Sequence, residues 1–167
     1  MRHVALLGIL TAACAWPALA APLTPPELLK DIHQQGPRNV VAQLSAGNGA
    51  QWTDVLNRIS MGNDEWLAVA AALRPGTDAG TGEDLTGALA YALLKNPQGV
   101  LPLTGGSIPL EAVCNVPLIE PTDAQVAKWK AEALTALSRV KATSLAREVA
   151  ACRADFLAVP VHQDSGA

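Results

Sequence analysis

The stretch PTDAQVAKWKAEALTALSRVKATSLAREVAACRADFLAVP, residues 121–160, indicates the fold class of this chain. Its apolar residues recur every three or four positions, which is the spacing of one face of an α-helix. Thr122 and Gln125 form a capping box, and we expect a helix of about eighteen residues to follow. After a break near residues 142–144, a second helix carries Cys152 and Phe156 on its apolar side. The sequence therefore predicts two consecutive helices at this end of the chain.

Short helices are also expected between residue 24 and residue 121. Alanine and leucine are abundant and only 4% of the residues are aromatic, a composition that favours helix over sheet. Glycine and proline interrupt the apolar patterns repeatedly, for example at Gly36-Pro37 and Asn96-Pro97. We expect further helix caps at Thr24, Asn63, Thr81 and Ser107.

The predicted fold class is all-α. We expect about seven to nine helices, arranged as an irregular bundle or as a short array. The closely spaced helices, several with proline in the first turn, resemble HEAT and armadillo repeats in local style. No period of about forty residues supports a repeat assignment.

Residues 1–20 are typical of a signal peptide. Arg2 supplies the positive start, and an Ala-Leu-Ala motif ending at Ala20 supplies the cleavage site. Residues 4–13 form an apolar run whose length falls within the range of about 7 to 15 residues that is usual for the hydrophobic part of a signal peptide. We therefore expect a periplasmic or secreted protein whose mature chain begins at Ala21. The same reading divides the remainder into a single helical domain, residues 21–160, and a flexible tail, residues 161–167.

Simple cleavage has two alternatives. A membrane anchor is disfavoured because Pro17 interrupts the apolar stretch and no basic cluster follows it. We therefore expect no stable membrane span. Lipidation at Cys14 would instead tether the chain to the membrane, but Thr11 stands where such signals usually carry leucine.

The mature chain keeps two cysteines, Cys114 and Cys152. An even number of cysteines in an exported protein favours a disulfide, because the compartment is oxidising. The alternative is a pair of buried free thiols. A catalytic thiol is disfavoured because the chain has no C-x-x-C motif and neither cysteine has a histidine close by in the sequence.

The charge pattern disfavours nucleic acid as a partner. The chain has a net charge of −3, and loss of Arg2 with the signal makes it −4, whereas phosphate binding requires a basic surface. Residues 48–86 hold six acids and two arginines, and residues 121–158 hold six basic residues and four acids. An acidic end could attract a cationic partner.

The best local candidate for a site is the polar segment of residues 77–84. It contains three acids, two threonines and two glycines, and its candidate contact residues are Thr77, Asp78, Thr81, Glu83 and Asp84. Helix capping explains these residues without a ligand. Protein contact is the second interpretation. Ca²⁺ binding is the third, because hard cations take oxygen ligands, although the spacing is not that of an EF-hand.

No motif for catalysis, for a metal or for a cofactor was found. His33 and His162 lie at opposite ends of the mature chain, and neither an H-x-x-x-H nor a G-x-S-x-G pattern occurs. We expect no cofactor and no metal. We assign the three tryptophans Trp52, Trp66 and Trp129 to the core, because each lies on the apolar side of its helix.

One stretch resembles small exported proteins of Gram-negative bacteria that have no assigned activity. The resemblance covers about fifty residues, from Trp52 to Leu101, and rests on the elements Ser60-Met61-Gly62, Trp66-Leu67, residues 77–80 and residues 96–101. It implies export and a small helical domain, and it implies no activity.

By elimination, we predict a non-enzymatic interaction or binding protein whose partner is a protein of the cell envelope. Two alternatives remain open. A cell-envelope hydrolase would need paired carboxylates in a cleft. A small-ligand carrier would need a pocket between helices, with a tryptophan in its wall.

The signal-peptide hypothesis predicts the mass of the exported protein. Intact-mass spectrometry should give a chain that begins at Ala21. A chain that begins at an acylated Cys14, seven residues longer and carrying lipid, would contradict simple cleavage.

Overall fold

A computed structural model describes residues 23–160, and the described part of the chain is all-α, as predicted. Residues 1–22 and 161–167, which include the expected signal peptide, Cys14, His162 and the expected tail, lie outside the described residues. Nine α-helices are present among the described residues: α1 (Pro25–Gln35), α2 (Pro37–Leu44), α3 (Ala50–Ile59), α4 (Asp64–Leu73), α5 (Ala79–Leu93), α6 (Pro97–Val100), α7 (Leu110–Val113), α8 (Asp123–Ser138) and α9 (Ala146–Ala158).

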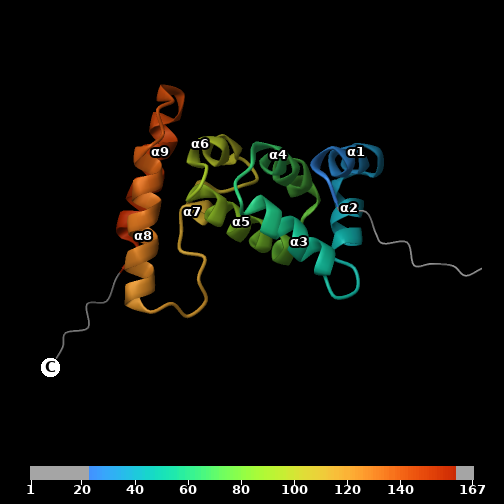
Figure 1. Cartoon of the computed structure of the whole chain (residues 1–167), viewed down its shortest axis with the longest axis horizontal. Helices are drawn as coiled ribbons and strands as arrows, with labels where there is room; N and C mark the ends of the chain where they lie inside the picture. Colours follow the sequence, from blue (N-terminus) through green and yellow to red (C-terminus); the bar gives the residue numbers. More distant parts are fainter. Residues whose placement is uncertain (1–22, 161–167) are drawn as a thin grey trace, which may run out of the picture.

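The helices are spread along the long axis broadly in sequence order, although α4 lies beside α1 and also contacts α2 (Figure 1). Helices α1 and α2 lie at one end of the long axis, and α8 and α9 pack side by side at the other. Helix α5 occupies the middle and contacts α3, α6 and α7. The chain therefore forms a short, irregular array of helices.

One continuous hydrophobic core runs through the array. Trp52, Trp66 and Trp129 are all buried in it, which confirms their assignment to the core. Trp129 of α8 meets the ring of Tyr91 of α5 edge to face, with the ring centroids 4.9 Å apart. Such aromatic pairs contribute about 0.5–1.5 kcal/mol beyond their buried area. This contact joins the C-terminal helices to the middle of the array.

Polar contacts reinforce the position of α8. The Lys130 ammonium donates to the carbonyl of Val159 at 2.5 Å, which ties α8 to the end of α9. Arg139, which follows the last residue of α8, donates to the carbonyl of Leu94 at 3.2 Å. These bonds satisfy carbonyl groups near the ends of α9 and α5, where helical partners are lacking.

The expected capping box of α8 is confirmed. The Thr122 hydroxyl accepts from the amide of Gln125 at 3.3 Å, and the Gln125 side chain accepts from the amide of Thr122 at 2.8 Å. The helix has 16 residues, close to the expected length.

The expected start of α5 is wrong by three residues. Asp78, and not Thr81, is the N-cap, and Thr81 is the third helical residue of the same capping box. A carboxylate is the stronger acceptor at a helix N-terminus, because its charge also interacts favourably with the helix dipole. Most of the polar segment of residues 77–84 is therefore the first turn of a helix and not a loop.

Three other expected caps differ in detail. The Thr24 hydroxyl donates to the carboxylate of Glu27 at 2.6 Å and accepts no backbone hydrogen bond. Asn63 precedes α4, as expected, but its side chain makes no capping hydrogen bond. Ser107 is not a cap, because it lies in a turn between Gly105 and Ile108, and α7 begins after Pro109.

The expected disulfide joins Cys114 to Cys152. Their Cα atoms are 5.2 Å apart, and the side chains are 1% and 0% exposed. Cys114 follows the last residue of the short helix α7, and Cys152 lies within α9. The bond therefore fixes the middle of the array to its C-terminal end.

Removal of this bond should lower stability markedly. The closed loop spans 38 residues, and the chain-entropy relation gives about 4 kcal/mol for a loop of that length. Urea unfolding of the double variant Cys114→Ala/Cys152→Ala, followed by tryptophan fluorescence, should show that loss in the free energy of unfolding. A loss below about 1 kcal/mol would contradict the structural role of the bond.

Candidate functional site

A groove of about 1000 Å³ crosses the surface of α5. Most of its lining comes from three parts of the chain: α5 with Asp78 before it, the end of α3, and residues 115–119 of the linker (115–121) between α7 and α8. Arg74, Pro109 and Ala112 complete the lining. We call this feature the groove. Its volume is at the upper end of the range of about 300–1000 Å³ for ligand pockets.

The α5 wall has small residues at its centre. A Cβ atom added to Gly87 would meet no atom within 4 Å, so the groove is open above this position. Gly87 stands four residues after Glu83 and four before Tyr91, and all three residues line the groove. Residues at this spacing share one side of a helix. Along α5, the groove therefore has an acidic end at Glu83, open space above Gly87 and an aromatic end at Tyr91.

Arg74 closes the groove near the start of α5. Its Nε donates to the carbonyl of Ser107 at 2.6 Å, and its Nη1 donates to the Thr77 hydroxyl at 3.4 Å. The guanidinium lies over Gly82, and a Cβ atom added there would be so close to Nη1 that the Arg74 side chain would have to move. Arg74 makes no ion pair within residues 23–160. It thus acts as a positioning residue between the end of α4 and the 105–108 turn.

Three carboxylates line the groove: Asp78, Glu83 and Asp84. Asp84 accepts a hydrogen bond from the indole nitrogen of Trp52 at 3.1 Å. Glu83 is exposed and has no hydrogen bond or ion pair within the described part of the chain. Counting Arg74, the charged side chains around the groove sum to −2.

Asp78 carries a perturbed pKa with a clear cause. The Thr81 hydroxyl donates to its carboxylate at 2.6 Å, and the Thr81 amide donates at 2.9 Å. Because both bonds favour the charged form, they hold the pKa of Asp78 below its ordinary value. Asp78 is therefore an ionised helix cap at neutral pH.

The linker forms the wall opposite α5. Val116 and Leu118 are half-buried, and Ile119 is 94% exposed, the most exposed large apolar side chain among the described residues. Residues 115–121 make no backbone–backbone hydrogen bond within the described part of the chain. Glu120 has a φ of 47°, in the left-handed region that residues other than glycine rarely adopt. The Val116 amide donates to the side chain of Asn115 at 2.8 Å. The linker thus presents apolar side chains, together with N–H groups at Leu118 and Ile119 that have no acceptor within the described residues.

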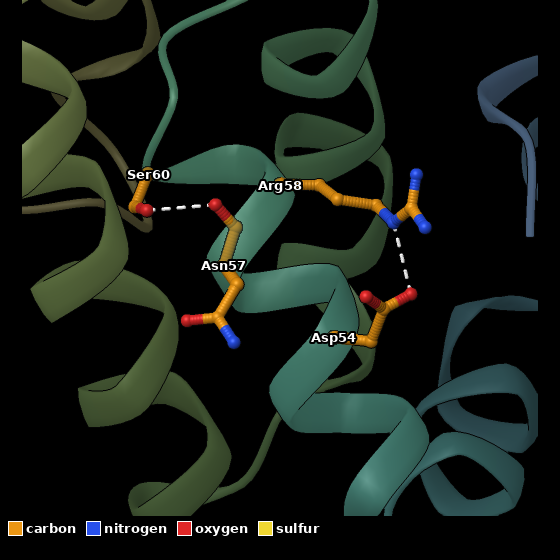
Figure 2. A network of polar contacts seen from close by, with 4 residues as sticks. All are labelled: Asp54, Asn57, Arg58 and Ser60. Atoms are coloured by element: carbon orange, nitrogen blue, oxygen red, sulfur yellow. Dashed lines mark hydrogen bonds and ion pairs between the residues drawn. The ribbon is translucent and has the colours of Figure 1, made fainter.

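The α3 wall is polar on the side of the groove. Figure 2 shows the Asp54–Arg58 ion pair at 2.9 Å on one side of the helix, with Asn57 and Ser60 on the other. Asn57 and Ser60 line the groove, and the Ser60 hydroxyl donates to the Asn57 carbonyl at 2.7 Å. The side-chain amide of Asn57 has no hydrogen-bond partner within residues 23–160. Leu56 also lines the groove, so this wall offers neutral polar groups beside one aliphatic side chain.

The structure brings together three of the five residues predicted for the site. Asp78, Glu83 and Asp84 line the groove, whereas Thr77 and Thr81 hold Arg74 and Asp78 in place. Sequence reasoning missed the linker and Tyr91. The available signal was the apolar pair Leu118-Ile119 between Pro117 and Pro121. Two prolines so close together disfavour a helix, so these apolar side chains have no helical face to occupy.

The carboxylates that line the groove lie together on one of its walls. All three belong to α5 or to its cap, and the linker residues that line the groove, 115–119, carry no charge. A general acid needs a raised pKa, and that of Asp78 is lowered. Within residues 23–160, no three His, Cys, Asp or Glu side chains lie close enough together to hold a metal ion.

Comparisons with known proteins found no matching family model, no matching curated protein and no matching solved structure. No helix among the described residues is both long and apolar enough to cross a membrane.

The Asp78–Thr81 contact predicts a pKa change. In the Thr81→Ala variant, the pKa of Asp78 should rise toward the ordinary value of about 3.9, because the variant lacks the hydroxyl donor. Carbon-detected NMR titration of the side-chain carboxyl group measures it. A pKa unchanged from that of the parent protein would contradict the role of Thr81.

The same contact sets the direction of the pH dependence of stability. The folded-state pKa is below the unfolded one, so the contribution is present above the unfolded value and lost as the pH falls through the folded value. Thr81→Ala should therefore lose less stability on acidification than the parent protein. Thr135→Ala is the matched control, because the Thr135 hydroxyl bonds only to the Ala131 carbonyl on α8.

Proposed function

We propose that this chain is an exported, non-enzymatic binding protein that holds part of a partner protein from the cell envelope in the groove. The observation that supports the proposal most directly is Ile119, an isoleucine 94% exposed at the wall of a groove of about 1000 Å³. Exposed apolar groups beside a concave surface are typical of binding sites.

The scaffold around the groove is suited to a permanent binding surface. The disulfide fixes the start of the linker through Cys114, and the capping box of Thr122 fixes its other end at α8. Pro117 and Pro121 further limit the backbone between those points. Because both of its ends are attached, the linker has less conformational entropy to lose when a partner binds.

The hydrolase alternative is less well supported. Glycosidases place their two carboxylates on either side of the bond that is cleaved. In the groove, Glu83 and Asp84 are neighbours on one helix, and the facing wall carries Val116 and Leu118 instead. A water molecule held between two opposed acids has no place in this arrangement.

The carrier alternative expected a tryptophan in the wall of the pocket. Trp52, Trp66 and Trp129 are all buried in the core, and none of them lines the groove. The only aromatic ring at the groove is that of Tyr91, among the described residues. A mixed polar and apolar groove fits a protein segment better than it fits an apolar small molecule.

Export is supported by two features of the chain. Residues 1–20 have the pattern of a signal peptide, and the two cysteines that follow it are paired. Structural disulfides persist in the periplasm and outside the cell and are rare in the cytosol. The proposed partner is accordingly a protein of the same compartment.

Site-specific photocrosslinking in the producing cell tests this function. A photoreactive residue at position 119 should form an adduct with a partner protein that mass spectrometry identifies. The same residue at position 157, where Leu157 is 64% exposed on α9 outside the groove, is the control and should not form that adduct.

A blocking variant completes the test. Gly87→Trp fills the open space of the groove and should abolish the adduct from position 119 without loss of stability, because glycine is a poor residue inside a helix. Ala42→Trp, at an exposed position on α2, should leave the adduct unchanged. No adduct, equal adducts from positions 119 and 157, or an adduct that survives Gly87→Trp would overturn the proposal.

A further inference from the structure

We infer that the occupant of the groove is an extended peptide segment that carries a lysine or arginine and, four residues away, an apolar side chain. The inference rests on the proposed function and names the chemistry of the partner. The cationic group lies at the Glu83 end of α5, and the apolar side chain lies at the Tyr91 end, beside the linker.

Charge complementarity places the cation. Glu83 and Asp84 have no cation within ion-pair distance in the described part of the chain, and Arg74 already donates to Ser107 and Thr77. One oxygen of Asp84 accepts from Trp52, which leaves the other oxygen without a partner in residues 23–160. An ammonium or guanidinium group would neutralise the surplus negative charge and provide the donors that these oxygens lack.

The apolar end of the groove needs a different kind of group. Tyr91 is 40% exposed there, although its ring also packs against Trp129. Ile119, from the linker, provides the second apolar surface. An aliphatic side chain that packs against either of these residues would remove apolar surface from water at about 25 cal/mol per Å².

The linker indicates that the occupant is a polypeptide. The peptide N–H groups of Leu118 and Ile119 have no protein acceptor within the described residues, and the backbone there is neither helix nor strand. An extended peptide can pair its own backbone with such a free segment, as in β-strand addition. Pro117 has no N–H, so the pairing is limited to a short stretch.

Helix geometry sets the spacing of the two groups. Eight residues separate Glu83 from Tyr91, which corresponds to about 12 Å along the axis of α5. An extended peptide covers that distance in about four residues at roughly 3.3 Å each. A four-residue spacing also places both side chains on the same face of an extended peptide, because side chains alternate between faces.

Synthetic peptides provide the probe. The reference peptide is a serine- and threonine-rich chain with one lysine and one leucine four positions apart, and its binding to the disulfide-bonded mature protein is followed by fluorescence anisotropy. We expect binding to be about tenfold tighter than for a peptide with glutamate in place of lysine. Placing lysine and leucine side by side, or methylating the backbone nitrogens, should weaken binding.

Charge reversal distinguishes a local contact from a general effect of net charge. Glu83→Lys should reverse the preference, so that the glutamate peptide binds more tightly than the lysine peptide. Glu65→Lys changes the net charge equally at an exposed position outside the groove and should leave the preference unchanged. Equal effects of the two variants would overturn the inference, as would methylated or adjacent-pair peptides that bind like the reference peptide.

Failure of this inference can be told apart from failure of the proposed function. If both peptide series bind equally and Gly87→Trp abolishes both, the groove binds peptides but the charge preference is wrong. If no peptide binds while position 119 still crosslinks to a partner, the proposed function stands and the peptide chemistry is wrong. If both experiments fail, both proposals are overturned.

Discussion

The covalent bond between Cys114 and Cys152 is the constraint on which the C-terminal half of the molecule depends. It closes a loop that contains the linker and all of α8, and it holds the start of the linker against α9. Without this attachment, the linker would be joined to the core only through partly buried side chains such as Val116 and Leu118. The groove has a defined wall opposite α5 because the bond fixes the place where that wall begins.

Local sequence patterns predicted the parts of the fold that local forces determine. The capping box of Thr122 and the apolar spacing after it indicated α8, and a single surviving pair of cysteines left only one disulfide to expect. The first turn of α5 was misplaced because the segment holds two competing caps. Asp78 and Thr81 have the same spacing as a cap and its partner, and only the relative strength of carboxylate and hydroxyl acceptors decides between them.

The groove could be predicted only in part, because its walls come from segments far apart in the sequence. The composition of residues 77–84 indicated Glu83 and Asp84. Nothing in the sequence around these two residues shows that residues 115–119 line the same groove. The close approach of the Arg74 guanidinium to Gly82 illustrates the difficulty. In the sequence, Gly82 is typical of a loop. In the structure, it leaves space for the Arg74 guanidinium, which also donates to the Ser107 carbonyl.

The hydrogen bond from the Trp52 indole to Asp84 couples the interior to the groove. Indole emission responds to the electric field around the ring, and a carboxylate oxygen of Asp84 lies 3.1 Å from the indole nitrogen. Trp52 is itself 5% exposed, so solvent quenchers have little access to it. Trp52 can therefore report on the groove without an added label. A charged group that binds at Asp84 would change the field at this buried indole and shift its fluorescence emission.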